Sequence, residues 1–214
     1  MNHSIKYWSL ILFIGTLWGF FEATLGGVLH ALQIPIAGKV MAPIGFAILF
    51  WGYKNSLKPH HMVLVSLIAA SLKFCDVFLF ALPFLHVKII NPAQSIILQA
   101  LCFAAATRFF RNFDQSLKGM LVTSLTIFTV SFLSSALLSY VAFDYTMGSL
   151  SVGLAATLFH LAIGSTLTFA GLTLMARVFT QGGLLNLNGV SLPTRATLSL
   201  LFIILTLVMR ASFV

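Results

Sequence analysis

Two ionisable side chains stand out within the first long apolar run of the chain. Glu22 and His30 lie in the stretch 18–30. A helix turns by about 100° per residue, so both fall within about 80° of each other, on one face. That face also carries small residues: Gly15, Gly19, Ala23 and Gly26. Small residues let a second helix approach closely in a membrane. We expect Glu22 to face protein or a cavity, because facing lipid is unfavourable.

Each of these two residues allows a structural and a functional interpretation. Glu22 either contacts a ligand or ion, or is a buried carboxylate paired for packing. His30, near the far end of the same run, either contacts a ligand or marks a helix end that meets water.

A second ionisable pair lies in the third apolar run. Lys73 and Asp76 are about one helical turn apart, so they can pair on one face. At about 1.5 Å per residue, Asp76 and Glu22 both lie about 21 Å from the start of their runs. The pair either stabilises its own helix or holds a polar ligand, in which case Lys73 can also act with Glu22.

Amide side chains mark the fourth run, and a histidine marks the sixth. Asn91, Ser95 and Gln99 recur every four residues and predict a polar stripe. Asn91 precedes a proline and suits a helix start, which does not account for the deeper Gln99. An interhelical hydrogen bond is the alternative for Gln99. His160 lies among glycines and threonines, where a histidine is either a hydrogen-bonded core residue or a ligand contact.

The depth of these side chains is their shared property. Glu22, Lys73, Asp76, Asn91 and Gln99 come from three separate runs, yet all fall at middle to outer depth. Unrelated polar residues would be distributed over both leaflets. We therefore expect a polar pocket that opens toward the outside.

The elements that position these residues follow from composition. The chain has 214 residues, of which 59% are hydrophobic and 7% charged, with a mean hydropathy of +1.04. Soluble domains carry about 25% charged residues. The composition predicts an all-α membrane bundle of six to seven transmembrane helices in one domain, 1–214. Seven apolar runs are present: 8–29, 40–53, 62–82, 92–110, 120–141, 152–175 and 196–209. The core bundle is expected at about 8–178, with an additional helix at about 196–213.

Basic residues predict the orientation. Lysines and arginines gather at the N-terminus and in every second connection: Lys6, Lys54, Lys58, Arg108, Arg111, Lys118, Arg177 and Arg195. Membrane proteins keep such residues on the cytoplasmic side. The pattern predicts a multi-pass protein of the cytoplasmic (inner) membrane with a cytoplasmic N-terminus, and it accounts for the net charge of +8 without nucleic acid. Arg210 disagrees with a seventh span, so the last run either crosses the membrane or lies on its surface.

Catalytic signatures are absent from the sequence. It contains no acidic diphosphate motif, Walker loop, H-E-x-x-H or G-x-S-x-G. Cys75 and Cys102 both lie in apolar runs and are expected to be packed thiols. We expect neither an enzyme, a cofactor nor a metal cage, although Glu22, His30 and His86 could converge on a transition metal.

Several short stretches together resemble a transporter family. The glycine-lined first run with Glu22 and His30 is followed by Ile-Pro-Ile-Ala-Gly at 34–38, Ala-Ala-Ser-Leu-Lys at 69–73 and Ile-Asn-Pro-Ala-Gln-Ser-Ile at 90–96. This succession resembles the membrane-embedded substrate-binding subunits of energy-coupling-factor transporters for vitamins and metals.

The resemblance covers about 8–178 and implies a compact bundle with a ligand pocket near the outer surface. It also implies partners, namely a transmembrane coupling subunit and ABC-type ATPases. In that family a small-residue stripe on the first helix contacts the coupling subunit. In this chain the A-x-x-x-A form of that stripe is absent, and Gly15, Gly19 and Ala23 could replace it on the face that carries Glu22. The seventh apolar run is a second departure, because the family usually has six spans.

The leading functional hypothesis is a substrate-capture component for uptake of a small polar nutrient, a vitamin-like compound or a metal. In this hypothesis Glu22 and Asp76 accept hydrogen bonds from the ligand, and Lys73 binds an acidic group of the ligand. Asn91 and Gln99 orient the ligand.

Two hypotheses from other classes stay open. The first is a structural or assembly subunit, in which Glu22 and Lys73 form internal or intersubunit pairs and the glycine faces are well packed. The second is a membrane enzyme in which Glu22 acts with His160 or His30 in acid–base chemistry.

Overall fold

The structure is all-helical wherever it is described. The computed structural model describes residues 3–32, 37–75, 77, 83, 86–110, 112–143, 153–181 and 187–211, and no strand occurs in these ranges. The longer helices are α1 (His3–Ala31), α2 (Ala37–Lys54), α3 (Pro59–Lys73), α5 (Val87–Phe109), α6 (Leu117–Phe143), α8 (Leu154–Gln181) and α9 (Leu192–Ala211). Two short 3-10 helices are η1 (Phe113–Gln115) and η3 (Leu187–Gly189).

Four helices are long and apolar enough to cross a membrane. They contain the stretches Tyr7–Leu29, Ile89–Phe109, Leu117–Ala142 and Leu154–Phe179. About 20 apolar residues span the hydrocarbon core. Large apolar side chains of α6, α8 and α9 point outward, including Leu137, Leu174 and Leu200 at 64%, 64% and 58% exposed. These outward-facing side chains suit contact with lipid, and the chain is a helical membrane bundle.

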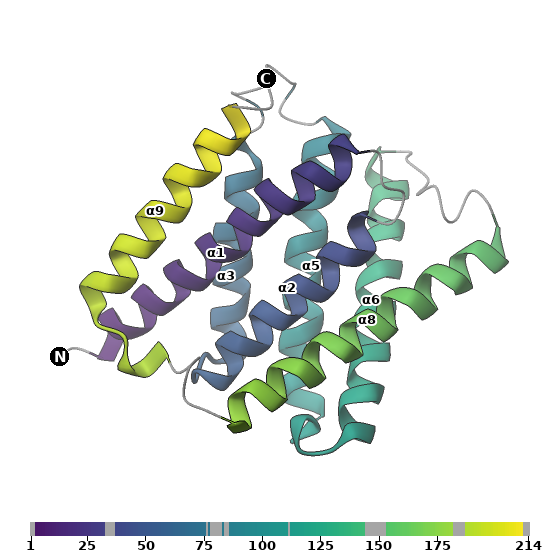
Figure 1. Ribbon diagram of the computed structural model, residues 1–214. Coiled ribbons are helices and arrows are strands. Elements are labelled where there is room, and N and C mark those ends of the chain that lie inside the picture. Colours follow the sequence, from purple (N-terminus) through teal and green to yellow (C-terminus); the bar gives the residue numbers. More distant parts are fainter. Residues whose placement is uncertain are drawn as a thin grey trace.

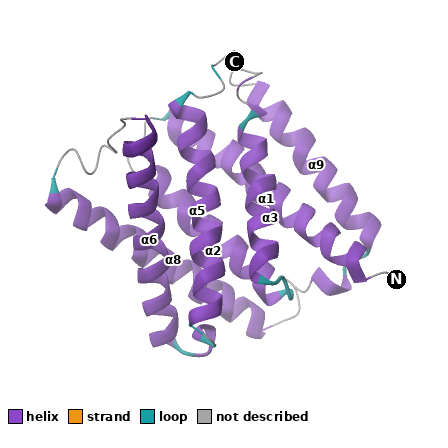
Figure 2. Ribbon diagram, turned by 180° about the vertical axis from the view of Figure 1, so that it is seen from behind, coloured by secondary structure: helices purple, strands orange, loops and turns teal. Residues whose placement is uncertain are grey.

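The helices pack in two layers (Figures 1 and 2). One layer has the order α9, α1, α2, α8, and the other has the order α3, α5, α6. Across the layers α1 packs on α3, α2 on α5, and α8 on α6. Helix α9 packs mainly on α1 at the edge of the first layer.

Successive helices run in opposite directions along the bundle, so the two termini lie at opposite ends (Figure 1). The N-terminus shares its end with the connections that join α2 to α3, α5 to α6 and α8 to α9. We call this the basic end, because these connections carry Lys54, Lys58, Arg108, Lys118 and Arg195. Lys54 pairs there with Asp114 at 2.8 Å.

Glycines allow the closest helix approach. A Cβ on Gly15 would lie 2.8 Å from Ile68 Cβ and 2.9 Å from the carbonyl oxygen of Val65, both on α3. A Cβ on Gly19 would meet Leu72, also on α3. Within the predicted small-residue face of the first run, Gly15 and Gly19 are therefore covered by α3 of the same chain. A partner that uses Gly15 and Gly19 would have to displace α3.

Every predicted apolar run corresponds to one of these helices. The largest differences are at the ends. The second helix begins at Ala37, three residues before the predicted run 40–53, and contains Pro43 in its interior, while 33–36 lie outside the described residues. The third run was predicted to reach residue 82, whereas α3 ends at Lys73. Most of the intervening residues are outside the described part.

Candidate functional site

Glu22 lies inside the bundle, between α1 and α2. Its side chain is 8% exposed. The carboxylate atom Oε2 lies 3.4 Å from the position of a Cβ on Gly26, and the Cγ and Cε atoms of Met41 on α2 lie 3.8 Å from that position. This burial agrees with the expectation that Glu22 faces protein or a cavity and not lipid.

Lys73 ends α3 beside the same part of α1. It is 7% exposed. Its neighbour Leu72 contacts Gly19, and Glu22 follows Gly19 by about one turn. The two buried charges thus lie at similar depth on α1 and α3. Burying opposite charges near each other is less unfavourable than burying either alone.

A third polar group comes from α5 and meets a tryptophan. Gln99 is 6% exposed and Trp18 is fully buried. Gln99 Oε1 lies 2.6 Å, and Trp18 Cζ2 lies 2.7 Å, from the position of a Cβ on Gly45 of α2. Glycine is therefore required at position 45 for α1, α2 and α5 to meet here. Trp18 precedes Glu22 by about one turn, which places this contact deeper in the bundle.

The polar atoms of Trp18 and Gln99 are unsatisfied. Neither the donor Nε1 of Trp18 nor the acceptor Oε1 of Gln99 has a hydrogen-bond partner within the described part of the chain. An unsatisfied buried group costs about 1–3 kcal/mol. A bound molecule with one acceptor and one donor would satisfy both atoms, as would an ordered water.

Asn91 and Ser95 contact a different neighbour. Asn91 Oδ1 accepts hydrogen bonds from Gln94 Nε2 at 2.9 Å and from the hydroxyl of Ser139 on α6. The hydroxyls of Ser95 and Ser135 bond at 2.7 Å. The residues of the predicted stripe therefore contact different helices. Asn91 and Ser95 join α5 to α6, while Gln99 faces α1 and α2.

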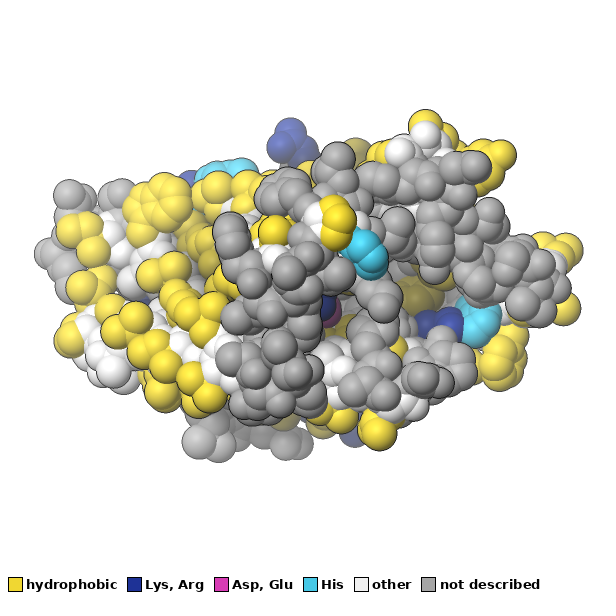
Figure 3. All heavy atoms as spheres, turned by 90° about the horizontal axis from the view of Figure 1, so that it is seen from above, with side chains coloured by type: hydrophobic (Ala, Val, Ile, Leu, Met, Phe, Trp, Pro, Cys, Tyr) yellow, Lys and Arg dark blue, Asp and Glu magenta, His cyan; other side chains and the backbone are white. Residues whose placement is uncertain are grey.

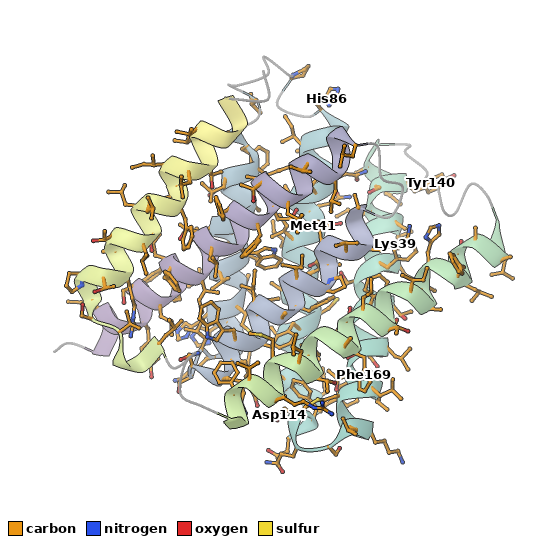
Figure 4. The ribbon with its side chains drawn as sticks, viewed as in Figure 1. Lys39, Met41, His86, Asp114, Tyr140 and Phe169 are labelled. Carbon is orange, nitrogen blue, oxygen red and sulfur yellow. The ribbon has the colours of Figure 1, made fainter. Side chains whose placement is uncertain are left out.

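His160 belongs to α8, which packs against the side of α2 that faces away from Glu22. It interacts electrostatically with Lys39, in the first turn of α2. Lys39 and Met41 are two residues apart, so they point to opposite sides of α2, Lys39 toward α8 and Met41 toward α1 (Figure 4). His160 Nδ1 is buried without a hydrogen-bond partner among the described residues. The structure does not bring His160 together with Glu22.

Two predicted site residues cannot be placed. Asp76 lies outside the described residues. His30 belongs to the last turns of α1, but its side chain is outside the described part. His86 lies at the end opposite the basic end (Figure 4).

The view down on that end shows two charged groupings (Figure 3). An acidic and a basic side chain are visible next to each other near the middle of this view, and a second basic side chain lies beside a histidine nearer the edge. The described residues contain no group of three or more histidine, cysteine or acidic side chains that could hold a metal ion. The buried polar side chains of Glu22, Lys73, Gln99 and Trp18 suit contact with a polar molecule, and the unpartnered atoms are Trp18 Nε1 and Gln99 Oε1.

Sequence reasoning missed a buried polar cluster at the basic end. The amide of Asn55, 1% exposed, accepts a hydrogen bond from the backbone N–H of Leu187 at 2.7 Å. Arg195, 2% exposed, donates to the carbonyl oxygen of Leu187 and to Ser9 Oγ. In the sequence, Arg195 is distinguished only as a basic residue that flanks an apolar run. Trp18 and Lys39 were also not assigned, because neither spacing nor residue type distinguishes them from packing or loop residues.

Comparison with known proteins gives no relative. No protein-family model, no curated protein and no solved structure matches the chain.

Proposed function

We propose that this chain is a membrane-embedded substrate-capture component for uptake of a small polar nutrient. The observation that supports the proposal most is that Trp18 Nε1 and Gln99 Oε1 are both buried without a hydrogen-bond partner among the described residues, with the buried Glu22 about one turn from Trp18 on α1. A protein that keeps a donor and an acceptor buried and unsatisfied gains stability when a molecule satisfies both. The ligand would carry an amide-like edge for Trp18 and Gln99 and polar groups for Glu22 and Lys73.

Native mass spectrometry of the protein purified in mild detergent tests this proposal. We expect a small molecule to be retained in stoichiometric amount by the wild type and to be lost in Gln99→Leu and Trp18→Phe. Gln115→Leu and Trp8→Phe are matched controls, since Gln115 and Trp8 are exposed. Absence of any retained molecule from wild type, after purification from cells grown in rich medium, would argue against capture.

The charged residues have a separate test. Once the retained molecule is identified, Glu22→Gln and Lys73→Met should weaken its binding while the variants still fold. Unchanged affinity in both variants would remove Glu22 and Lys73 from the site. Asn91, Asp76, His30 and His160 stay proposals as ligand contacts.

We propose that the basic end faces the cytoplasm and that the Glu22 site opens to the other side of the inner membrane. Basic residues on the cytoplasmic side are the general rule for such proteins. In a Cys75→Ser/Cys102→Ser background, a membrane-impermeant maleimide should label His86→Cys in intact cells. Lys58→Cys should react only after permeabilisation, and the reverse pattern would invert the orientation.

We further propose that a transmembrane coupling subunit and ABC-type ATPases energise release of the ligand. With Gly15 and Gly19 covered by α3, the partner is expected on an outward-facing surface instead. Affinity purification should recover these subunits with the chain.

A structural subunit is the second candidate, and the packing of the glycines favours it. The spaces at Gly15, Gly19 and Gly164 are filled by Ile68, Leu72 and Phe128 of the same chain. Recovery of the chain in a stable membrane complex, with no small molecule bound, would support this candidate over capture.

A further inference from the structure

A shallow groove at the basic end lies outside the site described above. It encloses about 340 Å³ between the end of α5, η1 and the first two turns of α6. It is lined by the apolar residues Phe110 and Val122, by the polar residues Asn112, Ser116 and Lys118, and by Phe113, whose side chain is only 3% exposed. The groove therefore offers apolar and polar contacts, and Lys118 adds a positive charge.

The charge of Lys118 is available to a ligand. Among the described residues no carboxylate pairs with Lys118, and the nearby Asp114 is bound by Lys54 at 2.8 Å. Gly119 donates its backbone N–H to Ser116 Oγ, which fixes the first turn of α6 beside Lys118. Among the described residues, an anionic group in the groove would therefore meet the charge of Lys118, while Asp114 is engaged by Lys54.

The surroundings of the groove are those of a membrane interface. Phe109 and Leu117, on the helices that flank it, are 78% and 60% exposed, and Leu121 and Val122 are 44% and 41% exposed. Apolar side chains this exposed at the ends of spanning helices contact lipid. A molecule in the groove thus has its polar part at the headgroup level and its apolar part against the acyl chains.

We propose that this groove binds one anionic phospholipid, with Lys118 at the phosphate and Phe110 and Val122 against an acyl chain. Charge complementarity favours a lipid over a neutral partner, since basic residues attract anionic lipids at the membrane surface. The mixed lining favours a lipid over free phosphate, which would leave Phe110 and Val122 uncovered.

Native mass spectrometry of the full-length protein tests the proposal. The delipidated protein is mixed with phosphatidylglycerol and phosphatidylcholine of identical acyl chains. We expect one phosphatidylglycerol to be retained in preference to phosphatidylcholine. Lys118→Gln should weaken its binding about fivefold, as expected for loss of one basic residue at the membrane surface, whereas Lys118→Arg should retain it.

Two further variants make the result specific to the groove. Lys58→Gln removes an exposed charge at the same end but outside the groove, and should leave lipid binding unchanged. Val122→Trp fills the groove while keeping Lys118, and should abolish retention without lowering the melting temperature. Equal losses in Lys58→Gln and Lys118→Gln, or equal retention of both lipids by the wild type, would overturn the proposal. Neither result depends on nutrient capture.

Discussion

Gly164 of α8 packs directly against an aromatic ring of α6. A Cβ at this position would overlap the ring of Phe128, which is 4% exposed and closely packed. Gly164→Ala should therefore destabilise the protein by about 1–3 kcal/mol through overpacking. Thermal unfolding in detergent measures this as a lower melting temperature.

Gly38 provides the matched control for that substitution. A Cβ on Gly38, in the first turn of α2, would meet nothing within 4 Å. Gly38→Ala should leave the melting temperature unchanged or slightly raised, because alanine favours helix. Equal melting temperatures for Gly164→Ala and wild type would contradict the packing at Phe128.

His61 gives the start of α3 a dependence on pH. The backbone N–H of Lys58 donates to His61 Nδ1 at 3.2 Å, and Tyr7 of α1 packs against the His61 ring. Burial, with the charges of His60 and Lys58, lowers the pKa of His61 below its ordinary value of 6.5. The unfolded chain therefore takes up this proton first, and the free energy of unfolding decreases as pH falls below about 6.5.

Melting temperatures at pH 7.5 and 5.5 test this dependence. His61→Gln should reduce the difference between the two values, because glutamine does not titrate. His86→Gln, at the other end of the bundle, should retain it. An undiminished difference in His61→Gln would assign the pH dependence to other groups.

At the scale of elements, hydroxyl groups join α5 to α6. Ser139 of α6 donates to Asn91 Oδ1, while Thr126 of the same helix donates to the carbonyl oxygen of Val122 one turn earlier. Ser139→Ala should destabilise the protein by about 0.6–1.5 kcal/mol, and Thr126→Val should not. Chemical unfolding in mixed micelles measures both. Equal effects would mean that the α5–α6 bond adds nothing beyond local helix stability.

Leu187 ties the α8–α9 connection to the rest of the bundle. Its N–H is held by Asn55 and its carbonyl oxygen by Arg195. Asn55→Ala and Arg195→Gln should each speed hydrogen exchange around residues 187–190. Since both act on one residue, their stability effects should be coupled by about 0.5–3 kcal/mol in a double-mutant cycle. Thr194→Ala, at an exposed position, is the control. Strictly additive effects of the Asn55 and Arg195 substitutions would contradict the inference that both residues act by holding Leu187.

The order and approximate bounds of these helices follow from sequence alone, because apolar runs of spanning length have one stable structure in lipid. Burial of Glu22 also follows, because its spacing places it on the glycine face. The meeting of Trp18, Gly45 and Gln99 does not follow, since it depends on how three separate helices cross. Periodicity shows which residues share a face and not which neighbour that face meets.

The same limit explains the other differences. Asn91 and Gln99 share a stripe, but they differ by about 80° around α5, enough to face two different helices. The Asn55–Leu187 bond joins residues 132 positions apart, and nothing in either local stretch indicates the other.

For the whole molecule, the edge position of α9 predicts that the remaining helices can form without it. Phe202 of α9 packs on Phe13 and Phe20 of α1, with ring centroids 6.0 and 5.3 Å apart. Removing α9 would expose these phenylalanines to lipid, where apolar contact is no less favourable than in protein. A chain truncated after Val190 should therefore insert and stay monodisperse on size exclusion, with a lower melting temperature. Aggregation of the truncated chain, but not of Phe202→Ala, would show that α9 is required.

Because of the two-layer order, some helices are synthesised well before the neighbours that they contact in the finished bundle. Helix α2 lies between α1 and α8, yet α8 begins 100 residues after α2 ends, from Lys54 to Leu154. Ribosomes add about 5–20 residues per second, so the α8-facing side of α2 is without its partner for about 5–20 s. Lys39 is on that side. In this interval a buried lysine of the finished protein must be accommodated by lipid headgroups, water or the insertion machinery. The delay is shorter for α1, because α3 follows it within a few dozen residues and then covers Gly15 and Gly19.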